Sequence, residues 1–234
     1  MQFDRVWTPA NWERLLVGDL ASQGVMGGLL LTLLLGFSSI GLATLLGTII
    51  GVLRDSPWRA LRAACTIYVQ AFRNVPLLIL VFWAYFFPVV FGLQLSKFAS
   101  VLVALTLFTA AYIAEIVRGG IRSLSRGHIE AARALGMSPL QIKLWIVLPQ
   151  ALFNMLPALA GRYIVTIKNT SLAFLIGLAD LTEIGKQIGA RLMTAPIEVY
   201  ITLLLTYFLV NRGLSALMRL LEDRQRFSRI FLRV

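Results

Sequence analysis

The chain has 234 residues, of which 58% are hydrophobic and only 14% are charged. Lys and Arg together number 22 against 11 Asp and Glu, so the formal net charge is +11. A soluble domain is typically about half apolar and about a quarter charged, and a disordered chain is far less apolar than this one. A basic chain can bind nucleic acid, but this one has little soluble surface to present, so we expect no nucleic-acid partner. The composition predicts an integral membrane protein with its positive charge on one side of the bilayer.

Metal and catalytic motifs are not expected in this sequence. Cys65 and His128 are each the single residue of their type, so neither a cysteine cluster nor a histidine relay can form. The Gly185-Lys186 pair is followed by Gln187, and Asp180 stands where a phosphate-binding loop would need glycine. The chain is therefore predicted to be no enzyme, to bind no metal and to leave ATP and its magnesium to a partner.

Apolar stretches of about 20 residues predict membrane-crossing helices. In the second such stretch, the uncharged run begins only near Pro76, so residues before Arg73 form either an interfacial helix or an extension of the span. A polar loop over residues 180–198 precedes the last stretch. The predicted spans cover residues 25–53, 61–95, 98–117, 153–178 and 197–217.

Two glycine pairs in the first span have the spacing that lets helices pack closely. They are Gly24 with Gly28 and Gly47 with Gly51. The spacing permits close helix packing, but by itself it is weak evidence that either pair is a real helix contact.

Orientation follows from the side on which Lys and Arg accumulate. The two loops that follow the first and third spans, together with the C-terminal segment, carry most of the 22 basic residues. This asymmetry predicts a cytoplasmic C-terminus, an N-terminus outside, and an odd number of spans, which agrees with the five found. Trp7 and Trp12 predict an interfacial anchor in the N-terminal segment, and the basic tail from residue 221 to 234 predicts contact with anionic lipid.

The longest polar connection has the sequence pattern of two helices joined by a sharp turn. An alanine-rich helix over residues 129–135 is followed by Gly136, which can take a left-handed conformation. Ser138 then caps a second helix, with Gln141 completing a capping box, and Pro149 is expected to limit that helix. Such a pair can simply pack on its own domain, so the pattern alone does not establish a docking element.

The residues of this connection, segment 118–150, resemble the EAA signature of ABC importer permease subunits. Similar motifs of polar amino-acid permeases lie at residues 72–78, 111–121 and 168–172, with Asn169 where Asp is common and His128 where Gln is common. The resemblance covers about residues 24–220, which leaves an N-terminal segment, 1–23, and the tail. The signature residues are Glu130, Ala131, Ala132, Gly136, Ile146, Val147, Leu148 and Pro149.

The resemblance implies an all-α, polytopic type I ABC importer permease with a five-helix core in the bacterial inner membrane. It implies a second permease subunit, identical or paralogous, a cytoplasmic ABC ATPase dimer that docks on the signature segment, and an extracytoplasmic amino-acid-binding protein. Glutamate or aspartate is the favoured substrate, with glutamine, histidine or arginine as the alternative. A channel or secondary transporter that needs no ATPase is the rival class, and a membrane scaffold is a third.

Polar residues inside apolar stretches are candidates for a substrate path, because buried charge in a bilayer is costly. Salt bridges, snorkelling near an interface and helix-helix hydrogen bonds are the competing interpretations. On the third span, Glu115 and Arg118 are expected to form a structural ion pair. The candidates for the path are Arg73, Arg162, Lys168, Asn169, Thr170 and Ser171.

Overall fold

The computed structural model describes residues 6–20, 24–192 and 196–231, and this part of the chain is mostly helical. The exception to the all-α prediction is a minimal hairpin. Strand β1 (Gly18–Asp19) pairs antiparallel with β2 (Val25–Met26), with Gly18 opposite Met26. The first spanning helix therefore begins at Gly28, three residues after the predicted start at Val25, because Val25 belongs to this hairpin.

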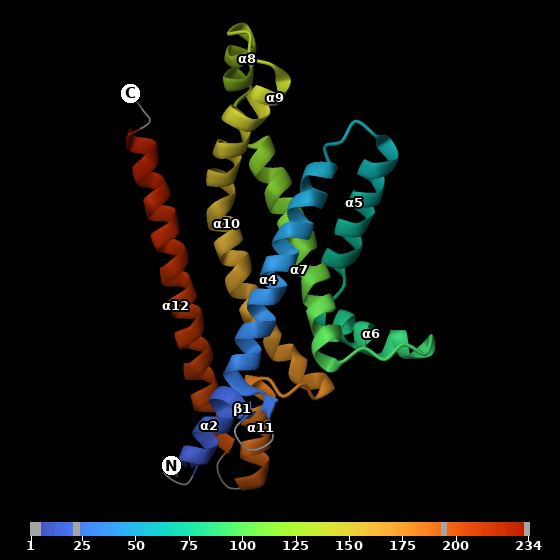
Figure 1. The fold of residues 1–234 in the computed structure, drawn as a ribbon, viewed down its shortest axis with the longest axis vertical. Helices are drawn as coiled ribbons and strands as arrows, with labels where there is room; N and C mark the ends of the chain where they lie inside the picture. The colour runs from blue at the N-terminus through green and yellow to red at the C-terminus, as the bar shows by residue number, and fades with distance from the viewer. Residues whose placement is uncertain (1–5, 21–23, 193–195, 232–234) are drawn as a thin grey trace.

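Three long helices form the centre of the bundle: α4 (Gly28–Leu53), α7 (Lys97–Arg122) and α10 (Leu148–Asn169) (Figure 1). Buried side chains of all three form one core cluster, which includes Ala43, Ile113 and Met155. The apolar character that predicts these spans is thus used partly for packing and partly, on the outer faces, for contact with lipid.

Close packing of α4 against α7 depends on the second glycine pair. A Cβ atom at Gly47 would lie 2.7 Å from the carbonyl oxygen of Ala110, and one at Gly51 would lie 2.8 Å from that of Ala114. This pair is a helix contact, as the spacing suggests. Gly24 and Gly28 do not act as such a pair, because Gly24 lies before α4 and has nothing within 4 Å of a Cβ atom. Gly28 starts α4 at a φ of 58° and alone packs closely against the backbone of Leu15 in α2, the helix that covers residues 9–17.

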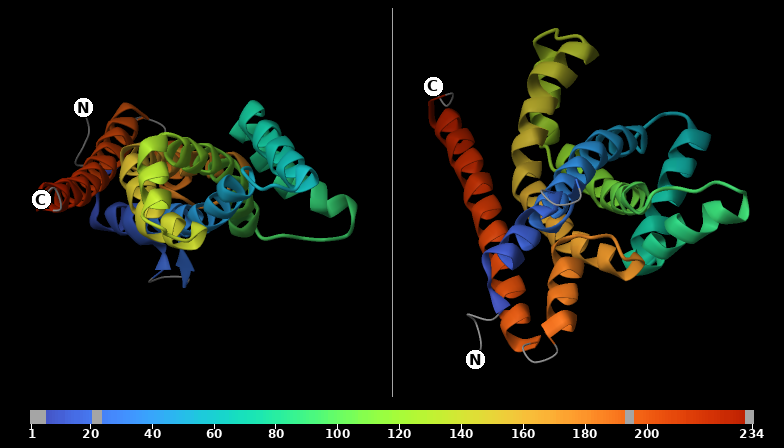
Figure 2. Two further views of the ribbon diagram at one scale, coloured as in Figure 1. Left: turned by 90° about the horizontal axis from the view of Figure 1, so that it is seen from above. Right: turned by 60° about the horizontal axis from the view of Figure 1, so that its bottom comes forward.

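The predicted second span is two helices, α5 (Arg59–Asn74) and α6 (Leu77–Val90), bent by 106°. Val75 is extended, as a residue before proline prefers to be, and Pro76 then starts α6. The two helices lie to one side of the central bundle (Figure 2). They meet the length and hydropathy of a span only together, as one broken span or a re-entrant loop.

The fourth span continues from the polar connection without interruption. Helix α8 (Arg126–Ala134) is followed by the short α9 (Pro139–Gln141), a π-helical turn η1 (Ile142–Val147), α10, and a 3-10 segment η2 (Thr170–Ile176). The prediction that Pro149 limits the second helix is wrong. Pro149 lies in the first turn of α10, where its missing N–H removes no helical bond after the π turn.

The last helices and the N-terminal segment meet at the other end of the bundle. Helix α11 (Leu181–Leu192) replaces most of the predicted polar loop, and α12 (Pro196–Phe231) carries a candidate span from Ile197 to Asp223. Helix α2 (Pro9–Val17) packs its Leu15 against both, and the Trp7 and Trp12 rings lie 4.7 Å apart beside them.

In the described part of the chain, four helices are long and apolar enough to cross a membrane, or five when the bent pair forms one span. Helices α8 and α9 lie at one end of the long axis, whereas α2 and α11 lie at the other (Figure 1). The C-terminal part of α12 points back toward the end that carries α8. The N-terminal helix and the signature segment therefore lie at opposite ends, as an odd number of crossings requires.

Candidate functional site

The predicted helix pair is present, and its turn is closed by hydrogen bonds. Gly136 has a φ of 76° and donates its N–H to the Arg133 carbonyl at 2.9 Å, while the Met137 N–H bonds the Ala132 carbonyl at 3.2 Å. These two bonds form a Schellman motif, which needs the left-handed residue. Immediately afterwards Ser138 and Gln141 form the predicted capping box, with bonds of 2.8 and 3.3 Å. Two successive caps fix this turn.

Three large apolar side chains of the helix pair and of the turn that follows it are exposed. Leu135, Leu140 and Trp145 are 83%, 65% and 73% exposed. Large apolar side chains at such exposure mark a contact site when they cluster. The signature motif does not include these three residues, although apolar residues that flank the capped turn are a signal visible in the sequence. Of the predicted coupling residues, Ala132 is buried, Ile146 is half-buried, and Glu130, Ala131, Gly136, Leu148 and Pro149 are exposed.

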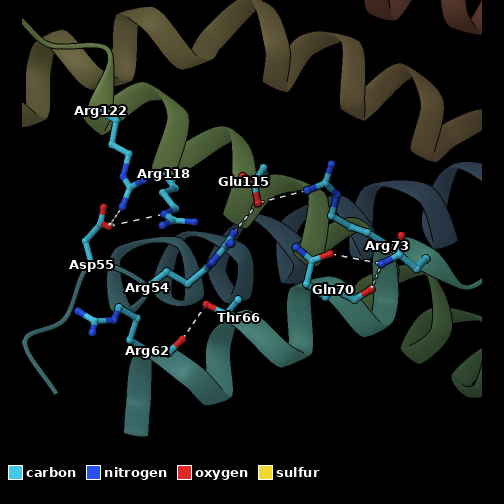
Figure 3. Close-up of polar contacts among 10 residues, drawn as sticks. Arg54, Asp55, Arg62, Thr66, Gln70, Arg73, Glu115, Arg118 and Arg122 are labelled. Atoms are coloured by element: carbon cyan, nitrogen blue, oxygen red, sulfur yellow. Dashed lines mark hydrogen bonds and ion pairs between the residues drawn. The ribbon is translucent and has the colours of Figure 1, made fainter. Parts of the chain in front are cut away.

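Glu115 on α7 is bonded to two arginines from other helices (Figure 3). Nη1 of Arg54, at the end of α4, donates to Glu115 Oε2, and Nη1 of Arg73 lies 3.2 Å from the same oxygen. Arg54 is only 2% exposed, although the sequence places it in a polar loop. This arrangement joins α4, α5 and α7 through one carboxylate.

The expected pair between Glu115 and Arg118 gives way to a second network on α7. Arg118 Nε lies 3.6 Å from Asp55 Oδ1, and Arg122 Nη2 lies 2.8 Å from the same atom (Figure 3). The reason is the packing of α4, whose end brings both Arg54 and Asp55 onto α7. Partners from a neighbouring helix replace the partner three residues away.

A cavity of about 430 Å³ lies between α5, α7 and α10, beside the Glu115 network. The guanidinium carbon of Arg162, on α10, lies 3.9 Å from the centroid of the Tyr112 ring and 5.0 Å from the centroid of the Phe108 ring. The structure thus brings together two of the predicted path residues, Arg73 and Arg162. The cavity is lined by Arg73, Tyr112, Glu115, Ile116, Ala158, Gly161, Arg162 and Val165.

A larger cavity of about 620 Å³ lies between α7 and α10, with Glu222 of α12 also on its wall, and extends toward the end that carries α8. It shares Ile116 and Ala158 with the first cavity and extends along Ser123 and Phe153. The two hollows therefore adjoin along the faces of α7 and α10.

The other predicted path residues line neither of these two cavities. Lys168 lines a separate hollow of about 420 Å³ between α10 and α12, with Asn211 and Arg212. Thr170 is fully buried and donates to the Ile167 carbonyl at 2.7 Å. The hydroxyl of Ser171 bonds the Lys168 carbonyl at 2.8 Å, and Asn169 stands at the junction of α10 and η2. Their hydroxyls thus satisfy backbone groups.

A bundle of long apolar helices with a charged cavity among them defines a multi-pass membrane protein. Residues 43–227 match the family described as the binding-protein-dependent transport system inner membrane component. The chain belongs to this family, whose members are permease components of ABC importers. Membership implies an ATPase and a binding protein as partners.

Several curated relatives are permeases for polar amino acids. The chain is 37% identical to the probable glutamine ABC transporter permease protein GlnP of Bacillus subtilis, over 85% of this chain and 92% of the relative. It is 35% identical to the glutamate/aspartate import permease protein GltK of Escherichia coli O6:H1, over 86% and 92%. It is 36% identical to the glutamate transport system permease protein GluD of Corynebacterium glutamicum, over 94% and 81%.

A solved structure shows the same fold. It is a crystal structure of an amino acid ABC transporter with histidines, with a TM-score of 0.80 and 33% identity over 84% of this chain and 92% of the other. A chain of the methionine transporter MetNI, in an inward-facing conformation, matches with a TM-score of 0.64 and 27% identity, over 81% and 92%.

Proposed function

We propose that this chain is the permease subunit of a bacterial ABC importer that carries glutamate and aspartate across the inner membrane. The observation that carries the proposal is the doubly capped helix turn at Gly136, with exposed Leu135, Leu140 and Trp145 around it. A rigid turn transmits movement, and apolar side chains at the end of a span bundle suit a docking partner. A dimer of cytoplasmic ATPases closing on ATP is that partner.

In this proposal α4, the bent pair α5 and α6, α7, α10 and α12 are the five spans of a type I core. The end that carries α8 faces the cytoplasm together with the C-terminal part of α12, and α2 lies outside. The loop between α4 and α5, predicted to be cytoplasmic, is at the same end as α8, which supports this orientation (Figure 1). A second permease subunit completes the path, and an outside binding protein delivers the amino acid.

The adjoining cavities between α7 and α10 are the proposed path through this subunit. They extend from the level of Arg162 and Glu115 toward the signature end. Glutamate and aspartate are favoured over glutamine because the smaller cavity, of about 430 Å³, is lined by two cations, Arg73 and Arg162, and by one carboxylate, Glu115. ATP and magnesium bind the partner ATPase.

Reconstitution in liposomes tests the function. The chain is incorporated with its ATPase and binding protein, and uptake of labelled glutamate, aspartate, glutamine, histidine and arginine is followed. We expect uptake only with ATP and all components, with the two acidic amino acids carried best. Uptake by the chain alone without ATP is the result of a channel or secondary transporter, and absence of uptake under every condition is the result of a scaffold. Either result contradicts the proposal.

A further inference from the structure

We propose that His128 is a positioning residue of the signature segment, and that its hydrogen bond to Gln150 joins α8 to α10 so that a push on α8 moves α10. Nδ1 of His128 lies 3.0 Å from Oε1 of Gln150. This inference rests on the proposed function, because it concerns how the movement of the ATPases reaches the membrane-spanning helices. It gives a role to a residue that the signature itself does not include.

Helix α8 has little packing against the membrane-spanning helices. Among residues 127–134, Ala132 alone is buried, with 4% of its surface exposed. The helix packs instead on the π turn η1, whose first residue, Ile142, is 5% exposed. With so few buried side chains, the direction of α8 relative to α10 depends on further bonds between the two.

The chain between α8 and α10 contains a place where it can bend. It passes through the turn at Gly136, through α9 and through η1 before α10 begins at Leu148. A π turn interrupts the regular hydrogen-bond ladder of a helix, and helices bend at such interruptions. Because two successive caps fix the turn at Gly136, we expect bending to concentrate in η1.

The bond between His128 and Gln150 bridges this bend. His128 lies in the first turn of α8, and Gln150 lies 22 residues further along the chain, in the first turn of α10. Helix α8 is thus connected to α10 at both of its ends, by the chain at its C-terminus and by this bond near its N-terminus. Two separated connections oppose the pivoting that a single one permits, so α8 and the start of α10 move together.

The same face of α10 makes a second polar contact with this region. Asn154 lies four residues after Gln150, on the same side of the helix, and its Nδ2 donates to Ser123 Oγ at 2.9 Å. Ser123 directly follows the end of α7, just before α8 begins. The start of α10 is therefore bonded to the chain on both sides of the junction between α7 and α8.

The chemistry of the bond indicates which substitution can replace the imidazole. An amide oxygen only accepts, so Nδ1 of His128 carries the hydrogen and donates to Gln150 Oε1. Nδ1 also carries a hydrogen in the protonated ring, so the bond does not depend on the charge of His128. An asparagine at this position has its Nδ2 donor bonded to Cγ, as Nδ1 is, and can donate from the same place.

Coupling in proteoliposomes tests this assignment. They contain the permease–ATPase complex, with ATP inside and the binding protein outside, and the ratio of labelled amino acid taken up to ATP hydrolysed is measured. We expect His128→Ala and Gln150→Ala each to retain the ATPase on purification but to lower this ratio about twofold to tenfold, the range for loss of one hydrogen bond. The double variant should be no worse than either single one, because both remove the same bond.

The matched control is His128→Asn, which keeps a donor at the same place and should keep the wild-type ratio. Alanine favours a helix more than histidine does, and asparagine favours it about as much. A loss in His128→Ala that is absent in His128→Asn therefore cannot come from weakening of α8 itself.

The outcomes separate this inference from the proposed function. A wild-type ratio in both alanine variants, in complexes that still transport, overturns the role of His128 alone. A ratio in His128→Asn as low as in His128→Ala overturns it too, because the ring would then act through a different contact. If His128→Ala loses its ATPase, Gln150→Ala decides from the side of α10, and a wild-type ratio there contradicts the inference. Absence of ATP-driven uptake in the wild type contradicts the proposed function itself.

Discussion

Arg54 and Glu115 are 61 residues apart in the sequence and hydrogen-bonded in the structure, where the buried guanidinium of Arg54 donates to Glu115 Oε2 (Figure 3). Removing the carboxylate would leave Arg54, with a side chain only 3% exposed, without its counter-ion. Stranding a buried charge in this way costs about 3–5 kcal/mol. The lower end applies here, because the Glu115 side chain is 40% exposed.

We therefore expect Glu115→Ala to lower the stability of the protein by about 3 kcal/mol. Thermal unfolding in detergent measures the change. The double variant Arg54→Met with Glu115→Leu removes both charges and should regain most of the lost stability, since apolar side chains can replace an ion pair. An unfolding temperature for Glu115→Ala equal to that of the wild type would falsify the structural role of this pair.

Gly47 offers a second test, because the contact between α4 and α7 leaves no room for a side chain there. A Cβ atom would lie 2.7 Å from both the carbonyl oxygen of Ala110 and the Cβ of Ile113. The backbone oxygen cannot rotate away, so the helices must separate. We expect Gly47→Ala to destabilise the protein by about 1–3 kcal/mol.

The matched control for Gly47 is Gly41→Ala in the same helix. Nothing lies within 4 Å of a Cβ atom at Gly41, so the variant should gain up to about 1 kcal/mol from helix propensity. Thermal unfolding of the two variants should move in opposite directions. A shift of the same sign and size for both would mean that α4 and α7 are not packed as described.

The structural features that the sequence predicts correctly are those set by residues close together along the chain. Gly136, Ser138 and Gln141 lie within six residues, so the Schellman motif and the capping box follow from neighbours along the chain. The spans follow from hydropathy in the same way. The 106° bend at Pro76 does not, because proline permits an extended residue before it but sets no angle between the helices.

The structural features that the sequence does not predict depend on contacts between segments that are far apart along the chain. The sequence places Arg54 and Asp180 in polar loops, yet they are 2% and 0% exposed. Their burial depends on which helices meet, which no local pattern specifies. The same limitation separates Lys168 from Arg162: both lie on α10, but they line different cavities because α12 and α5 cover different faces.

Asp180 gives a prediction on pH. Its Oδ1 accepts from the Glu183 N–H at 2.9 Å at the start of α11, while burial raises the pKa of the carboxyl to about 7. Its Oδ2 has no hydrogen-bond partner among the described residues, and the nearby Glu183 carboxylate raises the pKa further. The pKa in the unfolded chain is about 3.9, so folding favours the protonated acid.

Stability should consequently fall as the pH rises from about 4 to about 7, because the unfolded chain releases this proton first. The difference of about 3 pH units corresponds to about 4 kcal/mol as an upper limit. Asp180→Asn cannot ionise, so its unfolding temperature should lack this part of the pH dependence and exceed that of the wild type at pH 8. Parallel pH profiles for the two proteins would exclude a buried, protonated Asp180.

Substitution of Gly136 tests whether the capped turn of the signature segment is needed for docking the ATPase, because it changes the backbone of the turn and no side-chain contact. Its φ of 76° is left-handed, and nothing lies within 4 Å of a Cβ atom there, so a substitution strains the turn without touching a neighbour. Valine resists this conformation, whereas asparagine tolerates it. We expect Gly136→Val to stay folded but to lose most ATP-driven amino-acid uptake, and to retain less ATPase on co-purification. Gly136→Asn should keep most of both. Because the two side chains are similar in size, equal uptake by these variants would show that the left-handed turn plays no part in docking the ATPase.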